Sequence, residues 1–130
     1  MDMILILLTM IFSHIVDDYY LQGWLASAKQ KLWWEKNAPE RLYRNDYIMA
    51  LFMHSFSWSF MIMLPIIVYL LSTGIRVQEW IAIPYFVNMA IHSIVDDLKA
   101  NKRKINLIQD QSIHLGQILV TWAVLWFYIK

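Results

Sequence analysis

Residues 47–71 read YIMALFMHSFSWSFMIMLPIIVYLL, and this stretch decides the fold class. It contains no Asp, Glu, Lys or Arg, and its one histidine is His54. About 20 predominantly apolar residues in a helix are enough to cross the hydrocarbon core of a bilayer. The stretch therefore predicts a transmembrane helix with a single ionisable side chain inside it.

Three further segments, residues 3–25, 79–98 and 110–129, also predict membrane-spanning helices. The spans at 3–25 and 79–98 have short apolar parts, because His and Asp side chains occupy their ends. Such ends must face protein or water instead of lipid. The prediction is one all-α domain, residues 1–130, that forms a polytopic four-transmembrane-helix bundle.

The composition agrees with a membrane protein. Hydrophobic residues make up 59% of the chain and charged residues 16%, whereas a soluble domain usually contains about 25% charged residues. The absence of cysteine excludes disulfides, thiolate zinc sites and cysteine nucleophiles. The net charge of +1 gives no indication of nucleic-acid binding. The predicted partner is the lipid bilayer, and homo-oligomerisation is left open.

Basic residues are concentrated in two of the three connections between the predicted spans. By the positive-inside rule such loops stay in the cytoplasm. We therefore predict a multi-pass protein of the inner (cytoplasmic) membrane with both termini outside the cytoplasm. The N-terminus lacks the basic start and cleavage site of a signal peptide, so it is interpreted as a retained first span. Nine of the eleven Lys and Arg residues lie in these two loops: Lys29, Lys31, Lys36, Arg41, Arg44, Lys99, Lys102, Arg103 and Lys104.

All four histidines of the chain lie inside or at the ends of these spans, together with several carboxylates. An Asp at a bilayer centre costs about 2.5–3.5 kcal/mol on insertion scales, so such residues are usually functional. The predicted topology places the polar groups of all four helices at one depth, just under the cytoplasmic surface. Residues four apart share one helix face, which predicts three polar stripes: His14/Asp18/Gln22, His92/Asp96/Lys99 and Asp110/His114/Gln117.

These side chains predict a metal site. Mixed His and carboxylate ligation suits Zn, Mn or Fe better than Mg or Ca. The set exceeds the four ligands of one structural zinc. It therefore predicts two divalent ions with a bridging carboxylate, or one ion whose histidines are oriented by further carboxylates. The predicted metal ligands are His14, Asp18, His54, His92, Asp96, Asp110 and His114.

Some alternatives stay open. The doubled acids Asp17-Asp18 and Asp96-Asp97 leave the choice of ligand ambiguous, although helical geometry favours Asp18 and Asp96. Instead of a metal, the cluster can carry a proton or ion relay. It can also be a set of structural hydrogen bonds between helices.

A metal ion at this depth would generate hydroxide from water and polarise a phosphoryl or carbonyl oxygen. We predict catalytic roles for Asp18, Asp96 and Lys99, with Lys99 drawing in an anionic substrate. The predicted function is a metal-dependent hydrolase that acts on a phosphoester in a lipid headgroup or an anionic small molecule. The alternative is a small channel, transporter or holin-like protein that moves protons or metal ions. The outer halves of the spans contain few polar residues, which favours the enzyme.

The motif set resembles a family of small bacterial and phage membrane proteins of unknown function. Its pattern is H-x3-D-x3-Q in the first helix, a lone His in the second, H-x3-D in the third, and D-Q-x2-H at the start of the fourth. Here the matching residues are His14/Asp18/Gln22, His54, His92/Asp96 and Asp110-Gln111/His114, across nearly the whole chain. The motifs are also similar to those of membrane-bound metal-dependent hydrolases, and that resemblance implies a hydrolase.

Overall fold

The computed structural model describes residues 3–129 of the chain. Its central element is the 28-residue helix α4 (Asp46–Thr73), which contains the whole apolar stretch 47–71. At 1.5 Å per residue it is about 42 Å long, more than the hydrocarbon core of about 30 Å. The helix therefore extends beyond the core. It ends at Gly74, whose φ of 72° suits glycine and whose N–H bonds to the carbonyls of Leu70 and Leu71.

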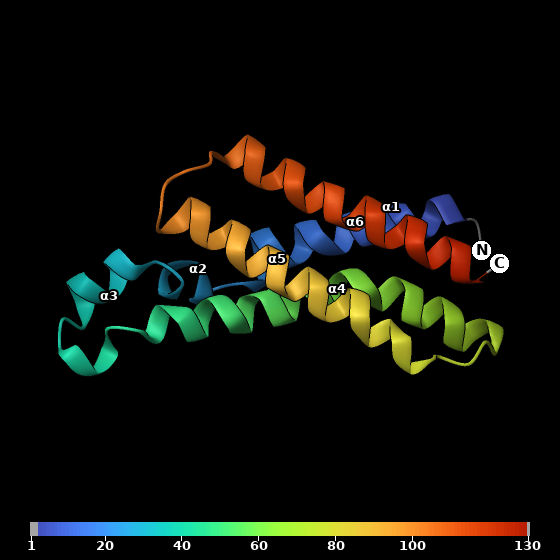
Figure 1. Cartoon of the computed structure of the whole chain (residues 1–130), viewed down its shortest axis with the longest axis horizontal. Helices are drawn as coiled ribbons and strands as arrows, with labels where there is room; N and C mark the ends of the chain where they lie inside the picture. The colour runs from blue at the N-terminus through green and yellow to red at the C-terminus, as the bar shows by residue number, and fades with distance from the viewer. Residues whose placement is uncertain (1–2, 130) are drawn as a thin grey trace.

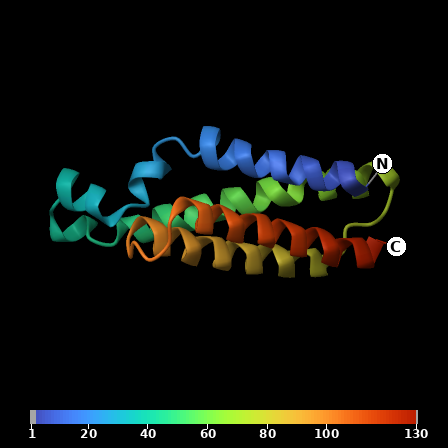
Figure 2. The same ribbon diagram turned by 90° about the horizontal axis from the view of Figure 1, so that it is seen from above.

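Three other long helices pack beside α4. The first is α1 (Met3–Val16), continued by the π-helical turn η1 (Asp17–Leu21); the others are α5 (Ala82–Ala100), preceded by the 3₁₀ turn η3 (Glu79–Ile81), and α6 (Leu107–Ile129). They form a ring in which α1 contacts α4, α4 contacts α5, α5 contacts α6, and α6 closes on α1. Figures 1 and 2 show both termini at one end of this bundle. The described residues are helical with no β-strand, as predicted.

The other end of the bundle is covered by the connection between α1 and α4. It contains α2 (Leu25–Ala28), α3 (Lys31–Asn37) and the 3₁₀ turn η2 (Arg41–Tyr43). Asn101, which follows α5, holds this connection in place through two hydrogen bonds. Its Oδ1 accepts a 2.7 Å hydrogen bond from the Lys31 N–H, and its Nδ2 donates to the Lys29 carbonyl over 3.1 Å. These bonds place Lys29 against the end of the bundle.

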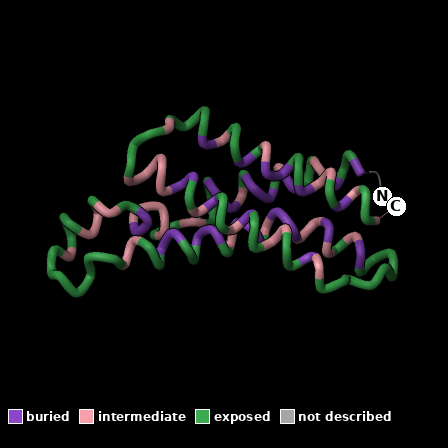
Figure 3. Tube along the Cα trace, in the orientation of Figure 1, coloured by how far each residue is buried: buried purple, intermediate pink, exposed green. Residues whose placement is uncertain are grey.

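The interior of the bundle has two halves of different chemistry. The half near the termini is apolar, with Met10, Ile62, Ile66 and Ile118 among its buried side chains. The half toward α2 and α3 buries His and Asp side chains instead. Figure 3 shows the buried positions along the inward faces of the helices and exposed positions on the outside. The polar half is the part of the core that needs a functional explanation.

The outside of the bundle is apolar as well. Phe12, Phe86 and Phe127 are between 56% and 79% exposed, which suits a lipid environment and not water. Within the described residues, three segments are long and apolar enough to cross a membrane: Met3–Leu21, Arg41–Thr73 and Leu107–Ile129. The fourth predicted span, on α5, falls short of that measure because it carries His, Asp, Asn and Lys side chains. The structure thus supports a membrane protein with three apolar spans.

Candidate metal centre

The four long helices each deliver one histidine to the polar half of the core. His14 comes from α1, His54 from α4, His92 from α5 and His114 from α6, and each is at most 2% exposed. The three predicted aspartate ligands are buried with them, at 8% exposure for Asp18, 3% for Asp96 and 0% for Asp110. All seven predicted ligands therefore lie in one cluster, and none of them faces lipid.

A first triad of side chains, Asp18, His54 and His92, has the spacing of metal ligands. The Nε2 atoms of His54 and His92 are 3.1 Å apart, and His54 Nε2 is 3.3 Å from Asp18 Oδ1. His92 Nε2 is 3.9 Å from the same oxygen. A tetrahedral ion with bonds of about 2.0–2.1 Å separates its ligand atoms by about 3.3–3.4 Å. Two of these distances are within about 0.3 Å of that geometry, and the third is about 0.5 Å longer.

A second triad, His92, Asp96 and His114, shares His92 with the first. His114 Nε2 is 3.4 Å from Asp96 Oδ1, and His92 Nε2 is 3.8 Å from Asp96 Oδ2. The two oxygens of Asp96 face different histidines, because Oδ2 also lies 3.4 Å from His54 Nε2. Asp96 therefore stands where a carboxylate bridging two ions would stand.

The hydrogen-bond partners of His114 indicate that the cluster needs an added positive charge, either a proton or a metal ion. Gln117 donates its amide N–H groups to Asn88, so its Oε1 accepts from His114 Nδ1 over 3.1 Å. In a neutral His114 the lone pair is then on Nε2. That atom faces Asp96 Oδ1 and, at 3.5 Å, Asp110 Oδ1, and it has no hydrogen-bond partner. Three atoms with lone pairs, one nitrogen and two carboxylate oxygens, therefore face one another. This arrangement is stable only if His114 carries a second proton or a metal ion lies between the three atoms.

The formal charges of the cluster lead to the same requirement. With carboxylates ionised and histidines neutral, four negative charges meet two ammonium groups, and two negative charges are left uncompensated. Burying an unpaired charge costs several kcal/mol. One divalent cation, or protons on two histidines, would balance them. The charged residues are Asp17, Asp18, Asp96, Asp110, Lys29 and Lys99.

His14 differs from the other three histidines because both of its nitrogens bond to side chains that are not predicted metal ligands. Trp58 Nε1, which can only donate, lies 2.8 Å from His14 Nδ1. His14 Nε2 therefore carries the proton and donates to Gln111 Oε1 over 3.0 Å. Gln111 Nε2 in turn lies 3.0 Å from Asp110 Oδ2 and 3.3 Å from Asp18 Oδ2. His14 and Asp110 lie outside both triads; Gln111 contacts both of them, and Asp110 also faces His114 of the second triad directly through its Oδ1.

The π-helical turn η1 explains why both neighbouring aspartates are buried. In a regular α-helix Asp17 and Asp18 would point about 100° apart. The wider turn, closed by the Gln22 N–H on the Asp17 carbonyl, lets both face the core at 1% and 8% exposure. Such turns occur often at functional sites. Ser57 Oγ donates to Asp17 over 2.7 Å, whereas Asp18 belongs to the first triad.

Sequence patterns assigned Lys29 to a basic loop, but the structure places its ammonium group in the cluster. Lys29 Nζ donates to Asp96 Oδ2 over 2.6 Å, and the residue is 8% exposed. The helical stripes contain no signal for this contact, because Lys29 lies in the connection between α1 and α4. Trp58 was missed as well: it is fully buried and stacks on His92 with ring centroids 4.2 Å apart.

Lys99, predicted as a substrate-binding residue, lies at the edge of the cluster. Its Nζ is 2.7 Å from Asp110 Oδ2, and its side chain is 33% exposed. The carboxylate of Asp110 pairs with this ammonium group at the edge of the cluster. Asp97 points elsewhere, as predicted, and pairs with Lys102 over 3.0 Å.

The Lys29–Asp96 pair leads to a first testable prediction. Lys29→Met should lower the free energy of unfolding by about 3 kcal/mol or more, because it leaves a buried carboxylate without its partner. Lys99→Met should cost clearly less, since water reaches its one-third-exposed side chain. Equilibrium unfolding in mixed detergent micelles would compare the two. Equal losses would contradict the structural difference between the two lysines.

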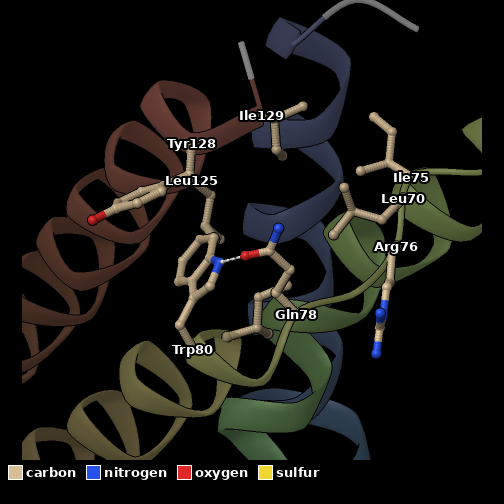
Figure 4. A pocket seen from close by; sticks show the side chains of 9 residues that line it. Leu70, Ile75, Arg76, Gln78, Trp80, Leu125, Tyr128 and Ile129 are labelled. Atoms are coloured by element: carbon tan, nitrogen blue, oxygen red, sulfur yellow. Dashed lines mark hydrogen bonds between the residues drawn. The ribbon is translucent and has the colours of Figure 1, made fainter.

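A hollow lies at the other end of the bundle from the His/Asp cluster, near the termini (Figure 4). It has a volume of about 140 Å³ and lies between the end of α4, the α4–α5 connection and the end of α6. Trp80 Nε1 donates there to Gln78 Oε1 over 2.9 Å. The described residues that line it include Arg76 but no histidine and no carboxylate. It offers no metal ligands, so the His/Asp cluster is the candidate site.

No family model, no curated protein and no solved structure matches this chain. The resemblance of its motifs to a family of small membrane proteins therefore stays a prediction. What is known of the site comes from the side-chain geometry of the two triads.

Proposed function

We propose that this protein is a membrane-embedded metal-dependent hydrolase. The observation that carries the proposal is the set of unpaired nitrogen and oxygen lone pairs that converge in the two triads. The proposed substrate is a phosphoester, in a lipid headgroup or an anionic small molecule. The resemblance of the sequence motifs to membrane-bound metal-dependent hydrolases agrees with this reading.

The donor chemistry supports one or two divalent transition-metal ions, Zn, Mn or Fe. The two triads share His92 Nε2, which can bind only one ion, so they support either one ion or two ions of which only one is bound by His92. In this reading Asp18, His54, His92, Asp96 and His114 bind metal directly. His14 acts through Gln111 as a residue that holds the ligands in position, whereas Asp110, whose Oδ1 is 3.5 Å from His114 Nε2, remains a candidate ligand. Lys29 neutralises one oxygen of Asp96 and limits how many protons or ions that carboxylate can attract.

When bound, the metal would supply a hydroxide nucleophile at neutral pH and polarise the phosphoryl oxygen. The oxygen of water forms a bond to phosphorus, the ester P–O bond breaks, and the leaving alkoxide takes a proton from that water. Asp18, whose Oδ2 lies outside the first triad, would hold that proton between the two events, while Asp96 would act through the metal that it binds. Lys99, at the partly exposed edge of the cluster, would pair with the anionic ester.

The proposed membrane arrangement has four spans, with α5 as the fourth. A helix with His and Asp on one face can cross a bilayer when that face is covered by neighbouring helices. Here His92 and Asp96 are buried against α4 and α6, while Phe86 and Val87 on α5 are at least 50% exposed. We place both basic loops in the cytoplasm, so the metal centre lies toward the cytoplasmic face of the inner membrane and both termini lie outside.

This orientation predicts the labelling of single-cysteine variants. Lys36→Cys lies in the connection that covers the site end, and Arg76→Cys lies in the connection at the other end. In intact cells a membrane-impermeant thiol reagent should label position 76 and leave position 36 unlabelled until the membrane is opened. The chain has no native cysteine to interfere. External labelling at position 36 would reverse the orientation.

A second candidate function is the movement of protons or metal ions across the membrane. One observation favours it: polar side chains continue from the cluster toward the other end of the bundle. His114 contacts Gln117, Gln117 donates to Asn88, and Asn88 donates to Thr121 over 2.7 Å. Beyond Thr121 the core of the described residues is apolar, with Leu125, Ile66 and Leu70 buried there. The polar chain therefore ends inside the bundle, which favours a closed catalytic site.

The two functions can be separated with purified protein. Protein prepared without chelator should contain one or two transition-metal ions per chain by elemental analysis, and it should hydrolyse members of a phosphoester panel. The same preparation in liposomes should show no proton flux above empty liposomes. Metal-independent proton flux that disappears in His54→Ala, without hydrolysis of any ester, would establish the transport function instead.

A further inference from the structure

A membrane-facing groove lies between α5 and α6. These helices are neighbours that run side by side from their short connection (Figures 1 and 2). The groove has a volume of about 570 Å³, and its walls are apolar side chains that include Ile83, Val87 and Ile91 of α5 and Ile113, Val120 and Val124 of α6. These six are between 38% and 65% exposed. Polar side chains occur in the lining only where Asn88, Gln117 and Thr121 close its base.

One end of the groove lies at the level of the metal centre, although no residue of the two triads lines it. Ile91 and Ile113 precede His92 and His114 directly in the sequence, so this end lies at the level of the second triad. Gln117 stands between the groove and the cluster, because it lines the groove and also accepts the hydrogen bond from His114. From there the groove runs toward Ile83 and Val124, away from the basic connection between α5 and α6.

The dimensions of the groove match one leaflet of a bilayer. Eight residues separate Ile83 from Ile91 along α5, a distance of about 12 Å at 1.5 Å per residue. Half of a hydrocarbon core is about 15 Å. Residues 83–91 and 113–124 lie around the middle of the predicted spans 79–98 and 110–129, so in the orientation proposed above the groove would hold the end of an acyl chain near the bilayer centre. Its upper end lies below Lys99 and Lys102, where an anionic headgroup would be.

The walls suit a flexible chain better than another helix. Helix pairs in membranes pack through small residues that let their backbones approach. The walls here are branched Ile and Val side chains, with Gly116 as the one glycine in the lining. The polar side chains at the base need no hydrogen bond from an occupant, because Asn88 donates to Thr121 and Gln117 donates to Asn88. An apolar tail leaves these hydrogen bonds intact.

We infer that this groove binds an acyl chain of a membrane lipid and presents the lipid's phosphoester to the metal centre. The inference rests on the proposed hydrolase and selects its substrate class: a phospholipid, and not a soluble phosphoester. The tail lies along α5 and α6, and the headgroup lies beside Lys99. Water enters from the cytoplasmic side to cleave the P–O bond as described above.

Gly116 allows the groove to be filled without disturbing the bundle. A Cβ added there meets no heavy atom within 4 Å, so Gly116→Leu places its side chain in open space within the groove. Ala90→Leu is the matched control. Ala90 is exposed on α5 and does not line the groove, so the control adds the same bulk to a lipid-facing position outside it.

Binding is measured in nanodiscs of phosphatidylglycerol that contain a trace of the same lipid with a diazirine on one acyl chain. After irradiation, wild type and Ala90→Leu should give adducts that map to residues 83–91 and 113–124. An apolar pocket discriminates about tenfold or more per methylene, so Gly116→Leu should reduce these adducts by at least about tenfold. Equal adduct yields in all three proteins would overturn the inference. A wild-type dimer that Gly116→Leu converts to a monomer would assign the groove to a second copy of the chain, which overturns it too.

Hydrolysis separates this inference from the proposed function. The substrates are phosphatidylglycerol and its deacylated form, glycerophosphoglycerol, which present the same phosphodiester with and without acyl chains. Wild type and Ala90→Leu should cleave the lipid faster, and Gly116→Leu should lose that preference while its metal content is unchanged. Metal-bound wild type that cleaves both substrates equally would overturn the inference and leave the hydrolase standing. Adducts in the groove with no metal and no hydrolysis would overturn the hydrolase and leave lipid binding supported.

Discussion

His92→Ala is expected to purify with essentially none of the metal that the wild type carries. His92 belongs to both triads, so its removal leaves neither triad complete. No neighbouring group can replace it, because the residue is fully buried on a helix and its position is held by the stacked ring of Trp58. Elemental analysis of protein prepared without chelator is the measurement.

His14→Asn is the matched control for this loss. His14 is equally buried, but its nitrogens bond to Trp58 and Gln111, and it lies outside both triads. Losing a residue that only orients ligands weakens metal binding by about 10–100-fold. His14→Asn should therefore keep metal at saturating concentrations. The variant His92→Gln, which keeps more of the side-chain volume, distinguishes lost ligation from lost packing. Full metal content in both His92 variants would remove His92 from the site.

Asp96→Asn should abolish turnover, with a fall of about 100-fold or more in kcat, while the bundle stays folded. Asp96 faces His54 and His92 through one oxygen and His114 through the other, so it belongs to both proposed ion sites. Ligand-orienting residues already cost up to about 100-fold when mutated. Asn keeps the volume and one acceptor for Lys29, and the cluster carries less unpaired negative charge, so folding is retained.

The neighbouring Asp97→Asn is the control for this variant. Asp97 carries the same charge one position along α5, but its side chain is 21% exposed and pairs with Lys102 outside the triads. Its turnover should stay close to that of the wild type. Asp18→Asn should behave like Asp96→Asn, because Asp18 is in the first triad. Steady-state hydrolysis by detergent-purified protein measures all three. Equal turnover in Asp96→Asn and Asp97→Asn would place the chemistry elsewhere.

The sequence by itself determined the helices and the faces that carry the polar groups. An α-helix has a fixed period, so His92 and Asp96, or Asp110 and His114, must share a face wherever the helix packs. Apolar length predicted helices close to the observed bounds of α4 and α6. Because the three stripes and the lone His54 were expected at one depth, the convergence of the four histidines could also be predicted. These properties are local or follow from the order of the spans along the chain.

Only the tertiary structure decided which of these groups meet and how. Lys29 enters the cluster through a loop whose position depends on Asn101, some 70 residues away. Trp58 and Gln111 occupy the nitrogens of His14, so the contacts between helices, and not the motif, remove His14 from the triads. The π turn that buries both Asp17 and Asp18 and the groove between α5 and α6 likewise depend on packing. Helical periodicity sets the direction of a side chain about its own axis, whereas the distance between two side chains depends on how the helices pack together.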